Sequence, residues 1–228
     1  MPPISAFGSE YAVPPYTTRR ADLQEESIPY RIVGAVKGTT LTYSPQVPGA
    51  PSSLAQGQVV DFQATGPFVV KSQDDNHPFY VGQVMTGCNV TGGGRGGCLG
   101  DEEYVNILAP AQFLTKYVFF TDPTYATTNL VFVRTKTPQG FKDVNLDCAG
   151  VLTGWKPMGS SGNFEITNID LIRDKKQNGS CDNGPHSADS AGPFGIMVWG
   201  LDTFSSYAYP AGGNIAPINT VIVPPTPN

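Results

Sequence analysis

Residues 194–213 constrain the fold more than any other part of the chain. An apolar run over Phe194–Leu201, spaced by glycines, is followed by a polar break and then by a second run, SSYAYP. β-Branched and aromatic residues among helix-breaking glycines favour strands over a helix. We therefore predict two buried strands, Gly195–Leu201 and Ser205–Tyr209, joined by a short turn.

The remainder of the chain repeats this pattern of short apolar runs between turn residues. The 228 residues include 26 glycines and 21 prolines, and only 14% are charged. A hydrophobic share of 39% is too high for a disordered chain, so the protein is folded and rich in turns. Because helical periodicity is almost absent, we predict an all-β, antiparallel sandwich or jelly-roll-like fold with little helix.

The composition changes along the chain, and these changes predict its organisation. A weakly marked boundary near residues 108–113 separates two sets of predicted strands. These sets form either two β-sandwiches that pack together or two lobes of a single β-sandwich. The expected parts are an extended N-terminal segment (1–28), a first β lobe (29–110), a second β lobe (111–220) and a C-terminal linker (221–228). The N-terminus lacks the features of a signal peptide, and both ends are rich in proline. We expect this chain to be cut from a longer precursor.

Three local predictions concern how the strands connect and how deeply they are buried. Tyr30–Val36 and Thr39–Tyr43 flank a Lys-Gly pair and are expected to form a hairpin, and Gln58–Ala64 is joined to Phe68–Ser72 across a Thr-Gly-Pro turn. In Lys116–Thr121 the apolar residues run continuously. A continuous run is typical of a strand buried on both faces.

The four cysteines indicate the compartment. They contain no CxxC pair, which argues against a zinc ribbon and against a thioredoxin-type site. Each of two pairs brackets a polar loop rich in glycine or asparagine, so we predict the disulfides Cys88–Cys98 and Cys148–Cys181. Disulfides persist in oxidising compartments, which favours a secreted or cell-surface protein. The alternative is four buried free thiols in a cytosolic protein.

One cluster of acidic residues could hold a metal ion. Asp74 and Asp75 lie in the turn SQDDNHPF, and Asp101 opens a second acidic turn. Hard carboxylate oxygens would favour Ca²⁺, although the EF-hand spacing is absent. The competing interpretation is a solvated turn whose acidic side chains bind their own backbone. No other cofactor is expected.

A second polar segment, GPHSADS, offers the residue types of a hydrolase triad. His186, Ser187, Asp189 and Ser190 crowd into what reads as one loop, without a GxSxG elbow. Triad members act from separate segments that are held in fixed geometry. We therefore predict that the protein is not an enzyme, with a hydrolase as the weakest alternative.

The charged and aromatic residues indicate which classes of partner the chain can bind. The net charge is −5 and the basic residues are scattered, so nucleic acid is not an expected partner. No run approaches the roughly 20 apolar residues of a membrane span, so membrane insertion is not expected. Tyr207 and Tyr209 share one face of a strand, and Trp155 lies in a turn. These three side chains are candidate ligand contacts, and the competing interpretation, which is favoured over ligand contact, is that they pack within the fold.

Five segments, taken in order, resemble the N-terminal domain family of the IgGFc-binding protein. They are GTTLTYSPQVPGAPSSLAQGQVVDFQ, PFVVKSQDDNHPFYVGQVM, GDEEYVNILAPAQFLTKYVFFTDPTYATTNLVFV, FKDVNLDCAG and GPFGIMVWGLDTFSSYAYPAGG. Together they span roughly residues 30–219. The resemblance is to the bacterial, myxobacterial-type branch of secreted and surface modules.

This resemblance implies an extracellular β-rich module of a larger surface or secreted protein, with no active site to transfer. We therefore expect a non-catalytic binding or adhesion module whose ligand is a protein or glycan at the cell surface. The alternatives are a structural spacer or assembly module of a cell-surface protein and, less favoured, the hydrolase. Antibody binding does not follow from the resemblance, because no residue-level Fc motif is available to match.

Overall fold

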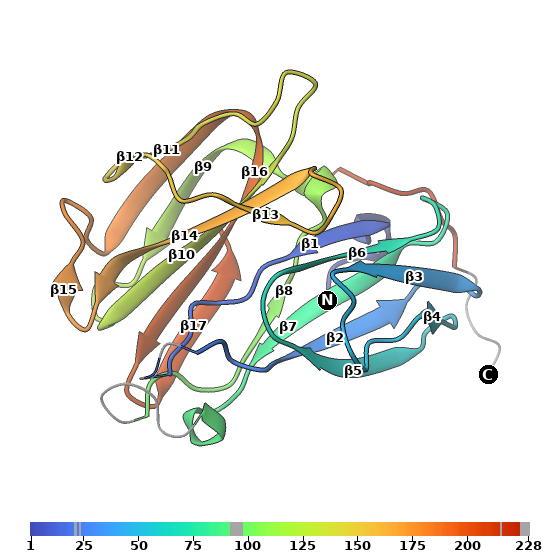
Figure 1. The fold of residues 1–228 in the computed structure, drawn as a ribbon, viewed down its shortest axis with the longest axis horizontal. Coiled ribbons are helices and arrows are strands. Elements are labelled where there is room, and N and C mark those ends of the chain that lie inside the picture. Colours follow the sequence, from blue (N-terminus) through green and yellow to red (C-terminus); the bar gives the residue numbers. More distant parts are fainter. Residues whose placement is uncertain (21, 23, 92–97, 215, 224–228) are drawn as a thin grey trace.

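The computed structural model describes residues 1–223 except 21, 23, 92–97 and 215, and it is all-β with antiparallel sheets (Figure 1). The first lobe contains η1 (Ile4–Ala6), β1 (Glu10–Val13), β2 (Ile28–Gly34), β3 (Thr39–Ser44), β4 (Ser53–Leu54), β5 (Val59–Ala64), β6 (Phe68–Ser72), β7 (Phe79–Met85), η2 (Cys88–Thr91) and β8 (Glu103–Asn106). The second lobe contains η3 (Pro110–Gln112), β9 (Leu114–Thr121), β10 (Thr127–Thr135), β11 (Val144–Leu146), β12 (Gly150–Val151), β13 (Lys156–Met158), β14 (Phe164–Arg173), β15 (Lys176–Gln177), β16 (Gly184–Asp202) and β17 (Ser205–Pro210). Among the described residues, no helix has the length and apolar character needed to span a membrane.

The first lobe is a sandwich of two four-stranded sheets. One sheet has the order β1-β6-β3-β4 and the other has the order β5-β2-β7-β8. Aromatic side chains from both sheets meet between them: Tyr30 lies 5.8 Å from Phe62 and 5.1 Å from Phe68, measured between ring centroids. Alternation along each strand sends these rings inward, which is the packing expected of a sandwich.

The second lobe is one nine-stranded sheet that curls back over itself. Its path is β12-β11-β16-β10-β14-β13, and β9 and β17 also pair with β16. Thr121 lies opposite Gly184, and Thr127 lies opposite Leu201. Only five residues separate the two threonines, so one short loop links the partners of the two ends of β16. The register of β16 against β9 shifts between Asp189 and Phe194, which is where the strand turns the corner.

The central strands β10 and β16 explain the apolar run that dominates the sequence. Leu130 and Phe132 of β10 point into the core of the second lobe, whereas Val131 and Val133 join the core of the first lobe. β16 does the same, with Val198 on one side and Trp199 on the other. Both faces of these strands are buried, which explains why apolar residues follow one another without alternation in their sequences. The two lobes therefore share a hydrophobic core.

Two of the local predictions, the hairpin after the second strand and the double-sided burial of residues 116–121, are wrong. β2 and β3 do not form a hairpin, because they lie in opposite sheets. β5 and β6 are joined across the Thr-Gly-Pro turn as expected, and they too lie in opposite sheets. Each tight turn therefore carries the chain across the sandwich. β9 is also not buried on both faces: Val118 is 83% exposed and Phe120 is 55% exposed. In the described structure β9 pairs with β16 alone, so it is an edge strand with an open outer face.

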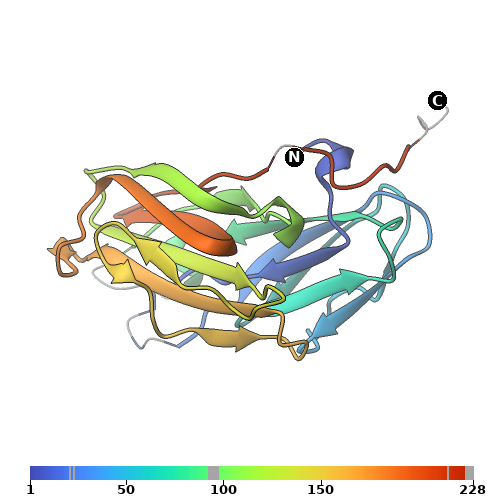
Figure 2. The same ribbon diagram turned by 90° about the horizontal axis from the view of Figure 1, so that it is seen from above.

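The chain ends lie beside each other. In Figure 2 the C-terminal segment (red) leaves the second lobe and runs towards η1 (blue). The amide of Ile218 donates to Ser5 O at 2.9 Å, and the side chain of Asn219 donates to the carbonyls of Ile4 and Phe7. Residues 1–28 contribute β1 to the first lobe as well as extended chain. The lobe boundaries drawn from composition stay a prediction, and residues 224–228 of the expected linker lie outside the described residues.

Candidate functional site: a polar groove between the lobes

Two hollows meet at Glu10 on the edge strand β1, where the lobes adjoin. The first, of about 260 Å³, is lined by Gly8, Ser9, Glu10, Asp75, Ala109, Pro110, Ala111 and Ile218. The second, of about 290 Å³, is lined by Glu10, Thr42, Tyr43, Ser44, Val69, Lys71, Ser160 and Ser161. We call the two together the inter-lobe groove. Ligand sites occur preferentially at such junctions.

The sheet register builds the floor of this groove. Lys71 on β6 lies opposite both Glu10 on β1 and Thr42 on β3, so the three side chains form a row across the outer face of the sheet. Burial alternates along β3, which leaves Thr42 exposed beside its buried neighbours. One acid, one base and one hydroxyl in a row can all hydrogen-bond to a ligand.

The wall of the groove comes from the second lobe. The Ser160 hydroxyl contacts the Ser44 hydroxyl at 2.9 Å, and the Ser160 amide donates to the same oxygen at 2.8 Å. Gly159 adopts φ +64°, and a Cβ there would lie 3.1 Å from Val69 and 3.2 Å from Ser44 O. Glycine therefore permits the close approach of this turn. On the other side of Glu10, the Ser9 hydroxyl donates to Asp75.

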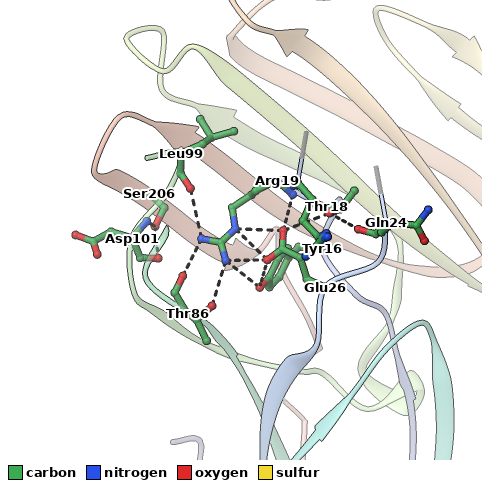
Figure 3. Close-up of polar contacts among 10 residues, drawn as sticks. Tyr16, Thr18, Arg19, Gln24, Glu26, Thr86, Leu99, Asp101 and Ser206 are labelled. Atoms are coloured by element: carbon green, nitrogen blue, oxygen red, sulfur yellow. Dashed lines mark hydrogen bonds and ion pairs between the residues drawn. The ribbon is translucent and has the colours of Figure 1, made fainter. Parts of the chain in front are cut away.

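A buried ion pair holds the N-terminal segment against the first lobe (Figure 3). Arg19 is fully buried and its guanidinium lies 2.8 Å from the Glu26 carboxylate. The guanidinium also donates to Thr86 O at 2.7 Å and to Leu99 O at 3.4 Å. Thr86 and Leu99 flank the loop closed by Cys88 and Cys98, so Arg19 fixes both ends of that loop.

The cysteines are brought together in the expected combination. The Cα atoms of Cys88 and Cys98 are 5.0 Å apart, and those of Cys148 and Cys181 are 4.8 Å apart. In the chain-entropy account, each bond stabilises the fold by about 3–4 kcal/mol. Residues 92–97 of the first loop lie outside the described residues.

His186 does not have the geometry of a catalytic base. Its Nδ1 lies 3.0 Å from the Asp147 carboxylate and its Nε2 lies 2.7 Å from Asp182 O. Each ring nitrogen therefore faces a hydrogen-bond acceptor within the chain. Neither nitrogen is positioned to take a proton from Ser187. The predicted loop is also wrong, because residues 184–190 form the first half of β16.

The acidic residues proposed for calcium do not gather into one cluster. Asp74 accepts from the amide of Asn76 at 2.8 Å and lies 2.7 Å from His77 Nδ1, which is a self-contained turn. Asp101 instead exchanges backbone hydrogen bonds with the Ser206 hydroxyl of β17 in the second lobe. Within the described part of the chain, the one group of three metal-ligating side chains is Asp147, Cys148 and His186. Calcium binding near Asp74 and Asp75 stays a prediction.

The candidate aromatic contacts all have partners within the chain. The Tyr207 hydroxyl accepts from the Asp122 amide at 2.9 Å, and the Tyr209 hydroxyl bonds to the backbone of Phe120. The Tyr207 ring lies over Gly200, where a Cβ would clash at 1.9 Å. These hydroxyls join β17 to β9 across the open edge of the lobe.

Trp155 is engaged in a similar way. Its indole N–H donates to Leu152 O at 2.9 Å, and the Arg134 guanidinium lies 4.1 Å from its ring centroid. A cation over an aromatic face stabilises both side chains where they are. Ligand contact by Trp155, Tyr207 and Tyr209 stays a prediction.

Comparison with protein families decides what kind of protein this is. A family model described as IgGFc binding protein matches residues 1–200. The chain belongs to the IgGFc binding protein family. Comparison with curated proteins and with solved structures finds no match.

Membership of the IgGFc binding protein family is membership of a binding family and not of an enzyme family. The disulfide pairs fit an extracellular member of it. Sequence reasoning had no means of finding the inter-lobe groove in this family member. Its lining residues are scattered from Gly8 to Ile218, and no motif links them.

In this IgGFc binding protein family member, Asp147 should make the free energy of unfolding depend on pH. Burial alone would raise the pKa of Asp147, but hydrogen bonds from His186 and from the Ser187 amide outweigh it, so the pKa lies below its ordinary value. A lowered pKa stabilises the fold above the unfolded value of about 3.9, and that stabilisation is lost as the pH falls through the folded value.

Thermal melts between pH 3 and pH 7 should therefore show the Asp147→Asn variant below wild type at pH 6, with the gap closing towards pH 3. A gap that stays constant over this range would contradict this assignment. Asp143→Asn, a change in the same region, serves as the control.

The tyrosines of β17 give a second test in this family member. Tyr207→Ala should destabilise the protein by about 2–3 kcal/mol, because it removes a half-buried ring that packs against Tyr125 at 4.7 Å. Tyr209→Phe should cost about 1 kcal/mol, the value of one hydrogen bond. Denaturant unfolding measures both. If Tyr207→Ala leaves the denaturant midpoint of unfolding unchanged and weakens ligand binding, the two tyrosines contact the ligand instead of stabilising the fold.

Proposed function

We propose that this chain is a non-catalytic extracellular module that binds a protein or glycan at the cell surface. Its membership of a binding family supports the proposal. Two cysteine pairs at disulfide distance support an extracellular location. The engagement of both His186 ring nitrogens speaks against the hydrolase alternative.

The observation that carries the proposal is the inter-lobe groove itself. Its two hollows meet at Glu10, and their lining combines carboxylates, an ammonium group and several hydroxyls. Such a lining favours a polar ligand bound through hydrogen bonds over an apolar one. The lobes share a core, so the groove is held in one shape before a ligand arrives, which reduces the ordering cost of binding.

A direct binding screen tests this function. The purified chain is applied to an array that carries glycans, mucins and an immunoglobulin Fc fragment, beside an unrelated acidic β-sandwich protein as the control. We expect saturable binding to at least one class. If the chain binds no surface of the array more strongly than the control protein does, the proposed binding function is contradicted.

A structural or assembly role is the second candidate, and the edge strand β9 favours it. Val118 and Phe120 expose a β-branched and an aromatic side chain on a strand that pairs on one side only. The backbone of Phe120 is already bonded to Tyr209, so a neighbouring module would pack on these exposed side chains rather than extend the sheet at Phe120. Sedimentation of wild type and Val118→Lys over a range of concentrations distinguishes the two roles. Association that the lysine abolishes favours assembly, whereas a monomer at every concentration argues against it.

A further inference from the structure

Four metal-ligating side chains converge at the start of β16. Asp147 and Cys148 directly follow β11, and the β11–β16 ladder sets them opposite His186. Ligand atoms of Asp147, Cys148 and His186 all lie within 4.8 Å of one another. Cys181 adds a fourth donor, because its sulfur is bonded to that of Cys148.

The groups around this cluster already orient it as they would around a metal. The Nε2 of His186 faces Asp182 O at 2.7 Å, which leaves Nδ1 directed at Asp147. The second oxygen of Asp147 accepts from the Ser187 amide at 2.8 Å. A metal-bound histidine usually donates its other ring N–H to a carbonyl or a carboxylate, and metal-bound carboxylates are themselves hydrogen-bonded. His186 is also buried, and its ring packs against Phe119.

We propose that in the reduced chain Cys148, Cys181, His186 and Asp147 form a zinc site. Two thiolates, an imidazole and a carboxylate make a tetrahedral donor set that suits Zn²⁺, and the sulfurs disfavour Ca²⁺ and Mg²⁺. The site and the disulfide exclude each other, because both use the same two sulfur atoms. The segment from β11 to β16 is thus held by a covalent bond in the oxidised chain and by an ion in the reduced one.

The exchange balances with a dithiol as the reductant. The dithiol gives two electrons to the Cys148–Cys181 bond and becomes a disulfide itself, and its two protons pass to the freed sulfurs. Zn²⁺ then displaces the proton of each thiol, and neutral His186 coordinates through the Nδ1 that carries no hydrogen. Zinc binding therefore releases protons, as expected for ligands that must be deprotonated.

The test uses the full chain with Cys88→Ser and Cys98→Ser, so that only one cysteine pair remains. The protein is reduced with a dithiol, freed of it by anaerobic gel filtration, and titrated with Co²⁺ and then with Zn²⁺. We expect one equivalent of Co²⁺ to produce a thiolate-to-cobalt charge-transfer band, which one equivalent of Zn²⁺ abolishes. The oxidised protein should show no band.

Matched variants assign the ligands. His186→Asn and Asp147→Asn should each weaken zinc binding at least tenfold, whereas His77→Asn, which changes the other histidine of the chain, should leave it unchanged. If the reduced chain is unfolded without metal, zinc should restore its circular dichroism. The proposal is overturned if the reduced chain yields no thiolate band, if zinc restores no structure to an unfolded chain, or if His186→Asn binds zinc as wild type does.

Discussion

Replacing Arg19 with leucine should destabilise the protein by about 3–5 kcal/mol, the cost of leaving one member of a buried ion pair without its partner. Arg19 and Glu26 are almost fully buried, and the guanidinium donates to Glu26, Thr86 and Leu99. Leucine would leave the buried Glu26 carboxylate without a counter-charge, with only the Tyr16 and Thr18 hydroxyls and a backbone amide donating to it, and two carbonyls would lose the guanidinium donor. Denaturant unfolding measures the loss.

Two variants show whether the burial of this ion pair causes the loss. Arg20→Leu breaks the neighbouring pair with Asp22, which is exposed, and should cost far less than Arg19→Leu, because solvent screens exposed ion pairs. The double variant Arg19→Met/Glu26→Leu removes both charges and should recover most of the stability. If Arg19→Leu costs no more than Arg20→Leu, the ion pair does not hold the N-terminal segment.

Trp199→Ala should cost about 3–5 kcal/mol, as other large-to-small changes in a core do. Trp199 is 1% exposed, belongs to the core that the two lobes share, and lies 5.0 Å from the Tyr16 ring. Because it packs between the lobes, its loss should lower the stability of both lobes together. Unfolding should remain a single transition when followed by tryptophan fluorescence and by far-UV circular dichroism.

The chain supplies its own control for this prediction. Trp155→Ala removes the other tryptophan, which is half-buried at the surface of the second lobe, and should cost clearly less than Trp199→Ala. Separate transitions for the two lobes in wild type would contradict the shared core, and so would equal losses for the two tryptophan variants.

The fold class could be predicted because its strongest signals are local. The glycine-spaced run at Phe194–Leu201 indicates a strand buried on both faces, and β16 has both faces covered there. The first half of β16 was missed because GPHSADS is as polar as a loop, and its partners β9 and β11 lie far away in the sequence. The apparent hairpin at β2–β3 failed because a tight turn does not reveal which sheet the next strand joins.

The inter-lobe groove and the buried ion pair could not be predicted for the same physical reason, because the residues that surround each are far apart in the sequence. Arg19 and Glu26 lie in a segment expected to be extended, and the carbonyls of Thr86 and Leu99 that bind Arg19 are 67 and 80 positions away from it. Burial of a charged side chain depends on such distant partners, which leave no periodicity in the chain. The Tyr207 and Tyr209 pair was placed correctly on one strand face, but only the curl of the second lobe reveals that their hydroxyls reach β9.

Filling the inter-lobe groove with a large side chain should block ligand binding. Thr42→Trp places a large ring in the hollow beside Glu10 and Lys71, whereas Thr40→Trp makes the same change two residues away, on the same face of β3 but outside the lining. Binding of both variants is measured on every surface that retains wild type. Thr42→Trp should lose at least tenfold in affinity, about 1.4 kcal/mol, whereas Thr40→Trp should bind as wild type does. Unchanged binding by Thr42→Trp on all of those surfaces would contradict it.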